Sequence, residues 1–178
     1  IIKSKNKFMK FFDCFMFYDE ELLLDMRMNI LNNYIDYFVI VESNKFHNGE
    51  DRKLKFNINA YPKFKDKIIY LVHDKNLDQL KKIEKNDDEG TKSFKFIYNA
   101  HLRENEQRNF LKNGLNKAAE EDLIFISDVD EIPNLEKIDL KKIKNKILMF
   151  EQNIFYYKLN RFLPNFKWYG TKACKKKY

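Results

Sequence analysis

The chain has 178 residues, of which 44% are hydrophobic and 16% aromatic, and its 34 lysines and arginines outnumber its 27 acidic residues by seven. This apolar content excludes a disordered chain and predicts one domain over residues 1–178. The sequence contains no leader and no run of about 18 apolar residues, so we expect the chain as given to be soluble, in an unknown compartment, with no membrane segment. Two cysteines, Cys14 and Cys174, are too few for a disulfide scaffold.

The first half of the chain is predicted to alternate strands with helices. Residues 10–17 form an aromatic-rich run typical of a buried strand, and the acids at 19–21 favour the first turn of a helix. Continuous apolar runs at 36–43 and 67–73 indicate strands that are covered on both faces of a sheet. We expect surface loops between and after them, with Asn48-Gly49 as a turn.

The second half continues the alternation. A helical pattern extends over 94–121, although Gly114 weakens it, and residues 123–127 (LIFIS) are the clearest buried strand. Residues 147–152 and 154–160 are predicted as two later strands. The pattern predicts an α/β fold, a three-layer α/β/α sandwich around a mostly parallel, Rossmann-like sheet.

Two aspartates follow the LIFIS strand directly. Asp128 and Asp130 are two positions apart, so in an extended segment both carboxylates point to the same side. Paired carboxylates at the carboxyl end of a strand suit Mg²⁺ or Mn²⁺ completed by phosphate oxygens, as in a bound nucleoside diphosphate. A solvated turn is the alternative, which the buried strand makes less favourable.

Three further charged residues allow two interpretations each. Arg108 can contact a phosphate, or it can pair with Glu104 one helical turn earlier. Asp13 and Glu42 are acids within otherwise apolar strands. Each can contact a ribose or base, or it can be a carboxylate satisfied by the protein itself.

Six motifs in order connect the chain to a known family. They are FFDCFMFYDEELLLDMRMNIL, DYFVIVES, ENEQRN, LIFISDVDEIP, FYYKLN and WYGTKAC, and they extend over residues 11–174. The set resembles glycosyltransferase family 17, the β-1,4-N-acetylglucosaminyltransferases that act on the β-linked mannose of N-glycans. Because members usually continue beyond the last motif, the acceptor side is expected to be incomplete or simplified here.

The resemblance implies a GT-A fold, a UDP-sugar donor carrying N-acetylglucosamine, a glycan or glycoprotein acceptor, Mn²⁺ or Mg²⁺, and inversion at the anomeric carbon. It implies metal ligation chiefly by Asp130, together with Asp128. The residues implied to contact the donor are Asp13, Glu42, Arg108 and Asp128.

Inversion in one displacement requires a general base near the acceptor hydroxyl. Glu131 is adjacent to the paired aspartates but points to the other side of an extended segment, whereas Glu151 lies in a predicted strand and is slightly preferred. Trp168 can stack on an acceptor sugar, although an anchor in the core is an equally good interpretation.

Two other functions remain as alternatives. A haloacid-dehalogenase-like phosphatase also has Asp-x-Asp after a strand, but near its amino terminus and with Thr or Val where this chain has Ile132. A nucleic-acid binder would agree with a pI of about 9.2. However, only five of the 34 basic residues are arginine, so no nucleic acid is expected as a partner.

Overall fold

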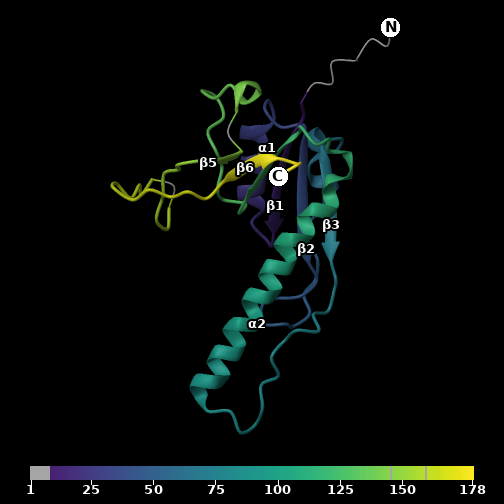
Figure 1. Cartoon of the computed structure of the whole chain (residues 1–178), viewed down its shortest axis with the longest axis vertical. Coiled ribbons are helices and arrows are strands. Elements are labelled where there is room, and N and C mark those ends of the chain that lie inside the picture. Colours follow the sequence, from purple (N-terminus) through teal and green to yellow (C-terminus); the bar gives the residue numbers. More distant parts are fainter. Residues whose placement is uncertain (1–8, 145, 159) are drawn as a thin grey trace.

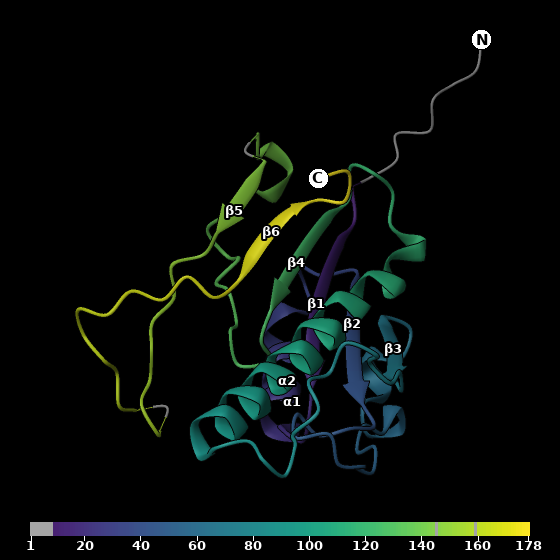
Figure 2. The same cartoon turned by 60° about the horizontal axis from the view of Figure 1, so that its bottom comes forward.

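The computed structural model describes residues 9–144, 146–158 and 160–178, apart from the side chain of residue 141. These residues form a mixed α/β structure around a six-stranded sheet in the order β3-β2-β1-β4-β6-β5 (Figure 2). The first four strands in this order are parallel, and β6 is antiparallel to both β4 and β5. The strands are β1 (Phe11–Phe17), β2 (Tyr37–Ser43), β3 (Ile68–His73), β4 (Leu123–Ser127), β5 (Ile147–Met149) and β6 (Lys172–Lys175).

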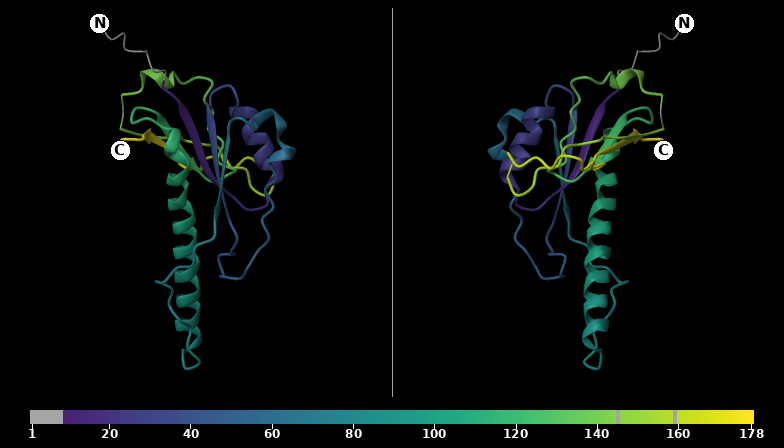
Figure 3. Two further views of the ribbon diagram at one scale, coloured as in Figure 1. Left: turned by 90° about the vertical axis from the view of Figure 1, so that its right-hand side faces the viewer. Right: turned by 90° about the vertical axis from the view of Figure 1, so that its left-hand side faces the viewer.

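Helices cover both faces of the sheet. Figure 3 shows α1 (Glu21–Leu31) on one face and the end of α2 (Glu89–Phe110) on the other, while the beginning of α2 projects beyond the sheet. None of the helices in the described residues is both long and apolar enough to cross a membrane. Four short 3₁₀ helices complete the described part: η1 (Ile58–Ala60), η2 (Pro62–Phe64), η3 (Leu111–Lys117) and η4 (Leu140–Lys142).

The alternation of β1 creates a separate apolar core on each face. Phe15 and Phe17 pack with Leu24 and other residues on the α1 side. Phe12 and Cys14 point the other way and pack in a second cluster, which includes Leu111 of η3. Each face of the sheet is therefore buried by the helix that the chain places over it.

The four predicted parallel strands are confirmed, but β3 lies at the edge of the sheet and its residues before His73 are only half-buried, so the expectation that both of its faces are covered is wrong. Leu123–Ser127 has the predicted bounds, and β1, β2 and β3 each begin one residue later than expected. The predicted helix over 94–121 instead begins at Glu89, because the side chain of Asp88 accepts a hydrogen bond from the main-chain N–H of Thr91 (2.7 Å) and caps it. It ends at Phe110, and η3 follows.

The expectation for the last strands was partly wrong. The strand predicted at 147–152 ends at Met149, and β6 was not predicted. The described residues of the predicted strand 154–160 form only an isolated bridge between Phe155 and Phe162; Leu159 lies outside the described residues. Tyr157 has a φ of 63°, a left-handed conformation that a regular strand does not accommodate.

Candidate functional site

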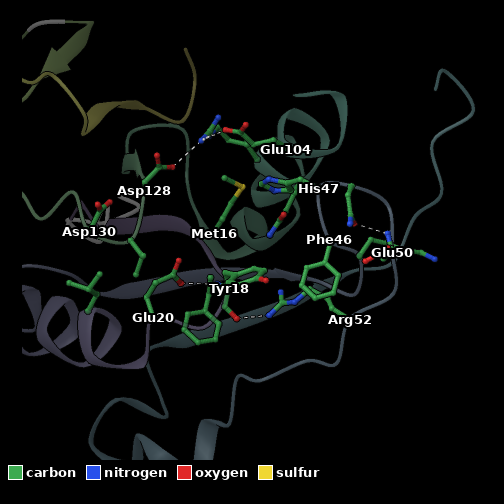
Figure 4. A pocket seen from close by; sticks show the side chains of 17 residues that line it. Met16, Tyr18, Glu20, Phe46, His47, Glu50, Arg52, Glu104, Asp128 and Asp130 are labelled. Atoms are coloured by element: carbon green, nitrogen blue, oxygen red, sulfur yellow. Dashed lines mark hydrogen bonds and ion pairs between the residues drawn. The ribbon is translucent and has the colours of Figure 1, made fainter. Parts of the chain in front are cut away.

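A cavity of about 820 Å³ opens beyond the carboxyl ends of β1 and β4. The chain proceeds from β1 to β2 and β3 on one side, whereas β4 lies on the other side of β1. Such a reversal of strand order creates a crevice where α/β proteins bind ligands. Figure 4 shows side chains from five segments around the cavity: the end of β1, the start of α1 with its N-cap Glu20, the loop after β2, the second half of α2 and the loop after β4.

Asp128 and Asp130 both line this cavity, but Val129 and Asp130 form a turn, and not the extended segment from which their shared side was predicted, so Val129 lines the cavity with them. Asp128 Oδ1 accepts a hydrogen bond from Arg108 Nη2 (2.9 Å), which also pairs with Glu104 Oε1 (3.1 Å). Burial alone would lower the pKa of Arg108, but the hydrogen bond and charge of Asp128, together with Glu104, raise it. The two interpretations of Arg108 do not exclude each other. Arg108 forms its ion pair with Glu104, and it does so at the cavity wall, where a phosphate would bind.

Asp130 carries a carboxylate without a positive partner. Among the described residues, no lysine or arginine forms an ion pair with it. Burial raises its pKa, and the nearby charges of Glu131, Asp128 and Glu20 raise it further. The cavity thus contains negative charge that a bound cation would stabilise.

Arg27 of α1 holds the loop that carries these acids. Its guanidinium is fully buried, and Nη1 donates to the main-chain oxygens of Asp128 (2.9 Å), Val129 (3.2 Å) and Glu131 (3.1 Å). A planar guanidinium has five N–H donors, and this geometry distributes them over the loop and two strands. Arg27 therefore fixes the backbone of the loop after β4, while the side chains of Asp128 and Asp130 line the cavity.

Asp13 supplies the counter-charge of Arg27. Its two carboxylate oxygens accept from Arg27 Nε (2.8 Å) and Nη2 (2.6 Å), and Nη2 also donates to Ser127 Oγ (2.5 Å). The side chain of Asp13 is 1% exposed and does not line the cavity. This geometry favours the interpretation of Asp13 as a carboxylate satisfied by the protein over direct contact with a donor.

Glu42 is also occupied by the protein. Its oxygens accept from the N–H groups of Lys55 (2.7 Å) and Phe56 (3.0 Å), from Arg52 Nη2 (3.1 Å) and from the hydroxyl of Tyr70 (2.8 Å). Burial and this hydrogen bond raise the pKa of Tyr70. Glu42 does not line the cavity, but Arg52, in the loop after β2, does. Glu42 therefore holds one end of this loop through its contact with Arg52.

The two predicted bases lie in different surroundings. Glu131 Oε2 accepts from the main-chain N–H of Asp128 (2.9 Å), and Oε1 accepts from Trp168 Nε1 (2.7 Å). Glu151 accepts from Lys167 Nζ (3.0 Å) and from the hydroxyl of Tyr169 (3.0 Å). These hydrogen bonds lower the pKa of Glu151, and neither Glu151 nor Glu131 lines the cavity. The structure thus brings Glu131 and Trp168 together beside the paired aspartates and places Glu151 apart from them.

Comparison with known families decides the class of the protein. The model of Glycosyltransferase family 17 matches residues 2–176. The chain belongs to glycosyltransferase family 17. The match covers nearly the whole chain and confirms the family that the six motifs indicated, so the protein is a glycosyltransferase. No curated protein and no solved structure matched. Membership favours glycosyl transfer over the phosphatase and nucleic-acid alternatives.

A family 17 enzyme that uses a divalent cation would have to hold it with few protein ligands. In the part of the chain that the structure describes, no group of three or more His, Cys, Asp or Glu residues is arranged to hold a metal ion. Asp128 and Asp130 are two carboxylates on one cavity wall. Because Mg²⁺ commonly binds one or two carboxylates together with water and substrate phosphates, this donor set fits a cation that binds with a diphosphate.

The sequence interpretation missed Arg27, although a signal was present. Leu24, Met28 and Leu31 are buried on one face of α1, and Arg27 lies on the same face. An arginine within an apolar helical stripe is seldom buried unless it is paired. That pattern could have identified Arg27 as part of a buried network.

Proposed function

We propose that this family 17 glycosyltransferase transfers N-acetylglucosamine from a UDP-sugar to a hydroxyl of a glycan acceptor, with inversion and with Mn²⁺ or Mg²⁺. One observation carries the proposal. Asp130 has no cationic partner among the described residues, and it lies beside the Asp128–Arg108 pair on the wall of an 820 Å³ cavity at the carboxyl ends of β1 and β4. A divalent cation that binds together with a diphosphate would supply the positive charge that Asp130 lacks.

The arrangement of the fold supports a GT-A-like, Rossmann-like assignment. The order β3-β2-β1-β4 is a parallel sheet with a reversal at β1, and helices cover both of its faces. In such sheets a nucleotide binds at the reversal. We therefore assign the cavity to the UDP moiety of the donor.

The residues of the cavity wall suit departure of a nucleoside diphosphate. Asp130 and Asp128 would hold the divalent cation, which when bound supplies positive charge to the leaving diphosphate. Arg108 is positively charged, as arginine is at any pH at which the protein is folded, and it presents a guanidinium that can contact a phosphate oxygen. Asp13 and Glu42 act indirectly in this proposal, since they hold Arg27 and Arg52.

Glu131 is the better candidate for the general base. It follows Asp130 directly, and its two oxygens accept one hydrogen bond each from Asp128 and Trp168. An ionised carboxylate has about four lone-pair sites, so it can also accept the proton of an acceptor hydroxyl. Neither Glu131 nor Glu151 lines the cavity, but Glu131 directly follows Asp130, which does, whereas Lys167 and Tyr169 lower the pKa of Glu151.

Release of UDP tests the donor and metal parts of the proposal. The protein is incubated with UDP-N-acetylglucosamine or another UDP-sugar, with Mn²⁺ or with EDTA, and slow hydrolysis of the donor is followed. We expect UDP release with Mn²⁺, loss of release in EDTA, and a decrease of at least about a hundredfold in Asp130→Asn, because a metal contributes several kcal/mol at the transition state.

The matched control is Asp66→Asn, which changes an exposed aspartate just before β3. It should release UDP at the rate of the unsubstituted protein. Release that is equally fast in EDTA, or that survives in Asp130→Asn, would contradict the proposal. Nuclear magnetic resonance of the anomeric proton in the transfer product then reports retention or inversion.

A further inference from the structure

A segment between β5 and β6 extends away from the sheet and exposes many aromatic rings. We call its described residues, 153–158 and 160–169, the aromatic arm; it is the green to yellow excursion in Figures 1 and 2. Its two sides are joined by a bridge between Phe155 and Phe162, and a bridge between Gln152 and Trp168 closes its base. Six rings on the arm are 44% to 83% exposed: Phe155, Tyr156, Tyr157, Phe162, Phe166 and Trp168.

The backbone holds these rings outward. Tyr157 has a φ of 63°, which is uncommon for a bulky side chain, and its ring is 83% exposed. The planes of the Tyr157 and Tyr156 rings are inclined at 70°, with centroids 4.3 Å apart, and the ring centroids of Phe155 and Phe162 lie 5.8 Å apart across the arm. Contiguous exposed apolar surface of this kind marks a binding surface.

The base of the arm is attached to the loop that carries the paired aspartates. Trp168 Nε1 donates to Glu131 Oε1 (2.7 Å), and Glu131 Oε2 accepts from the N–H of Asp128 (2.9 Å). Thr171 Oγ1 donates to the main-chain oxygen of Glu131 (2.8 Å). A Cβ on Gly170 would overlap both Glu131 Oε1 and Trp168 Nε1, so the contact depends on glycine there. The arm therefore begins beside one wall of the cavity.

We propose that the aromatic arm is the acceptor-binding surface and that it binds an oligosaccharide by stacking rings on the apolar faces of sugars. The proposal rests on the proposed function, because it assigns the acceptor to the side of the cavity where Asp130 and Glu131 lie. Exposed tyrosine and tryptophan rings have an apolar face and a polar edge, which matches the two kinds of surface on a sugar. A glycosyltransferase requires an acceptor beside its donor, and the arm is continuous with that wall.

Binding to an array of oligosaccharides, which includes the core pentasaccharide of N-glycans, tests the proposal. The full chain is compared with the double variant Tyr156→Ala/Tyr157→Ala. We expect the double variant to lose about tenfold or more in binding to the glycans that the unsubstituted chain binds, since two stacking rings are removed. Its UDP release without an acceptor should remain unchanged.

The matched control removes another exposed aromatic pair. Phe94 and Tyr98 lie on the projecting part of α2, are 57% and 38% exposed, and have ring centroids 6.0 Å apart. Phe94→Ala/Tyr98→Ala should leave binding to the array unchanged. Size-exclusion chromatography with light scattering accompanies each variant, so that association between copies of the chain is measured separately.

The outcomes separate the two proposals. Failure of metal-dependent UDP release in the unsubstituted chain would overturn the proposed function, whatever the array shows. Equal array binding by the unsubstituted chain and the Tyr156→Ala/Tyr157→Ala variant, or no binding by either, would overturn the role of the arm and leave the proposed function standing. A change of oligomeric state with unaltered array binding would also overturn it and would identify the arm as a contact between copies.

Discussion

Arg27 Nη1 donates a hydrogen bond to the main-chain oxygen of Asp128 at 2.9 Å, so a buried residue of α1 fixes the backbone of the loop at the cavity. The same guanidinium is neutralised by Asp13 of β1. Arg27 thereby connects helix α1, strand β1 and the loop after β4, which carries the paired aspartates. The buried ion pair positions the site without occupying the cavity.

Two variants at Arg27 distinguish its contribution to folding stability from its contribution to cation binding. Arg27→Met leaves Asp13 buried without a partner and should lower the free energy of unfolding by about 3–5 kcal/mol. The double variant Arg27→Met/Asp13→Leu should regain much of this stability, because apolar residues can replace a buried pair, but the loop loses the three hydrogen bonds that Arg27 donates to the main-chain oxygens of Asp128, Val129 and Glu131. We expect the double variant to require more Mn²⁺ for half-maximal UDP release, measured beside urea unfolding. Unaltered Mn²⁺ dependence would show that Arg27 is needed for stability alone.

Arg108→Gln should weaken donor binding more than stability. The side chains of Arg108 and Asp128 are 34% and 51% exposed, so loss of this pair should change the free energy of unfolding by no more than about 1 kcal/mol. Loss of a guanidinium that contacts the diphosphate should raise KM for the UDP-sugar about tenfold. Lys112→Gln, at an exposed position beyond α2, is the control. An unchanged KM would show that Arg108 forms its ion pairs with Asp128 and Glu104 but does not contact the donor.

The two glycines of the α2 region should respond in opposite directions to alanine. A Cβ on Gly114 would overlap Val39 Cγ1 of β2, so Gly114→Ala should destabilise the fold by about 1–3 kcal/mol. Gly90 lies in the first turn of α2, and a Cβ there would meet only Asp88 Oδ1 at 3.3 Å, the oxygen that caps the helix and that would have to shift by only a few tenths of an ångström. Gly90→Ala should therefore stabilise the protein by up to about 1 kcal/mol. Thermal unfolding of both variants checks the difference, and equal effects would contradict the close packing of η3 on β2.

His73 should make stability depend on pH. Burial lowers its pKa from the ordinary value of 6.5; Glu106 and Asp74 oppose this effect, and Lys75 adds to it. Below about pH 6.5 the unfolded chain binds a proton that the folded chain does not bind, so the free energy of unfolding decreases as the pH falls from there towards the lowered pKa. His73→Phe retains a ring against Phe110 and should remove this component, as urea unfolding between pH 7.5 and 5.5 would show.

His101 provides the control for that measurement. It lies on α2 with a side chain that is 69% exposed. His101→Gln should retain the pH dependence of the unsubstituted protein. If His73→Phe and the unsubstituted protein show the same decrease in stability, His73 is not the group responsible.

Local sequence patterns were sufficient to predict the four parallel strands and the paired aspartates. The runs that became β1, β2, β3 and β4 are apolar over strand length, a pattern typical of parallel strands whose two faces are covered by other elements, although β3, at the edge of the sheet, is only half-buried. Asp128 and Asp130 were identifiable because they follow the clearest of these strands. The arm was mispredicted for a local reason, since Tyr157 adopts a left-handed conformation that its residue type does not favour.

The partners of the charged residues depended on distant parts of the chain. Arg27 contacts Asp13 at a separation of 14 residues and the loop after β4 at separations of 101 to 104, so no local pattern could pair them. Trp168 and Glu131 are 37 residues apart and meet only because the chain returns from the arm to pair β6 with β4. Periodicity specifies which face of an element is apolar, whereas the partner of a buried charge is chosen by the packing of elements against one another.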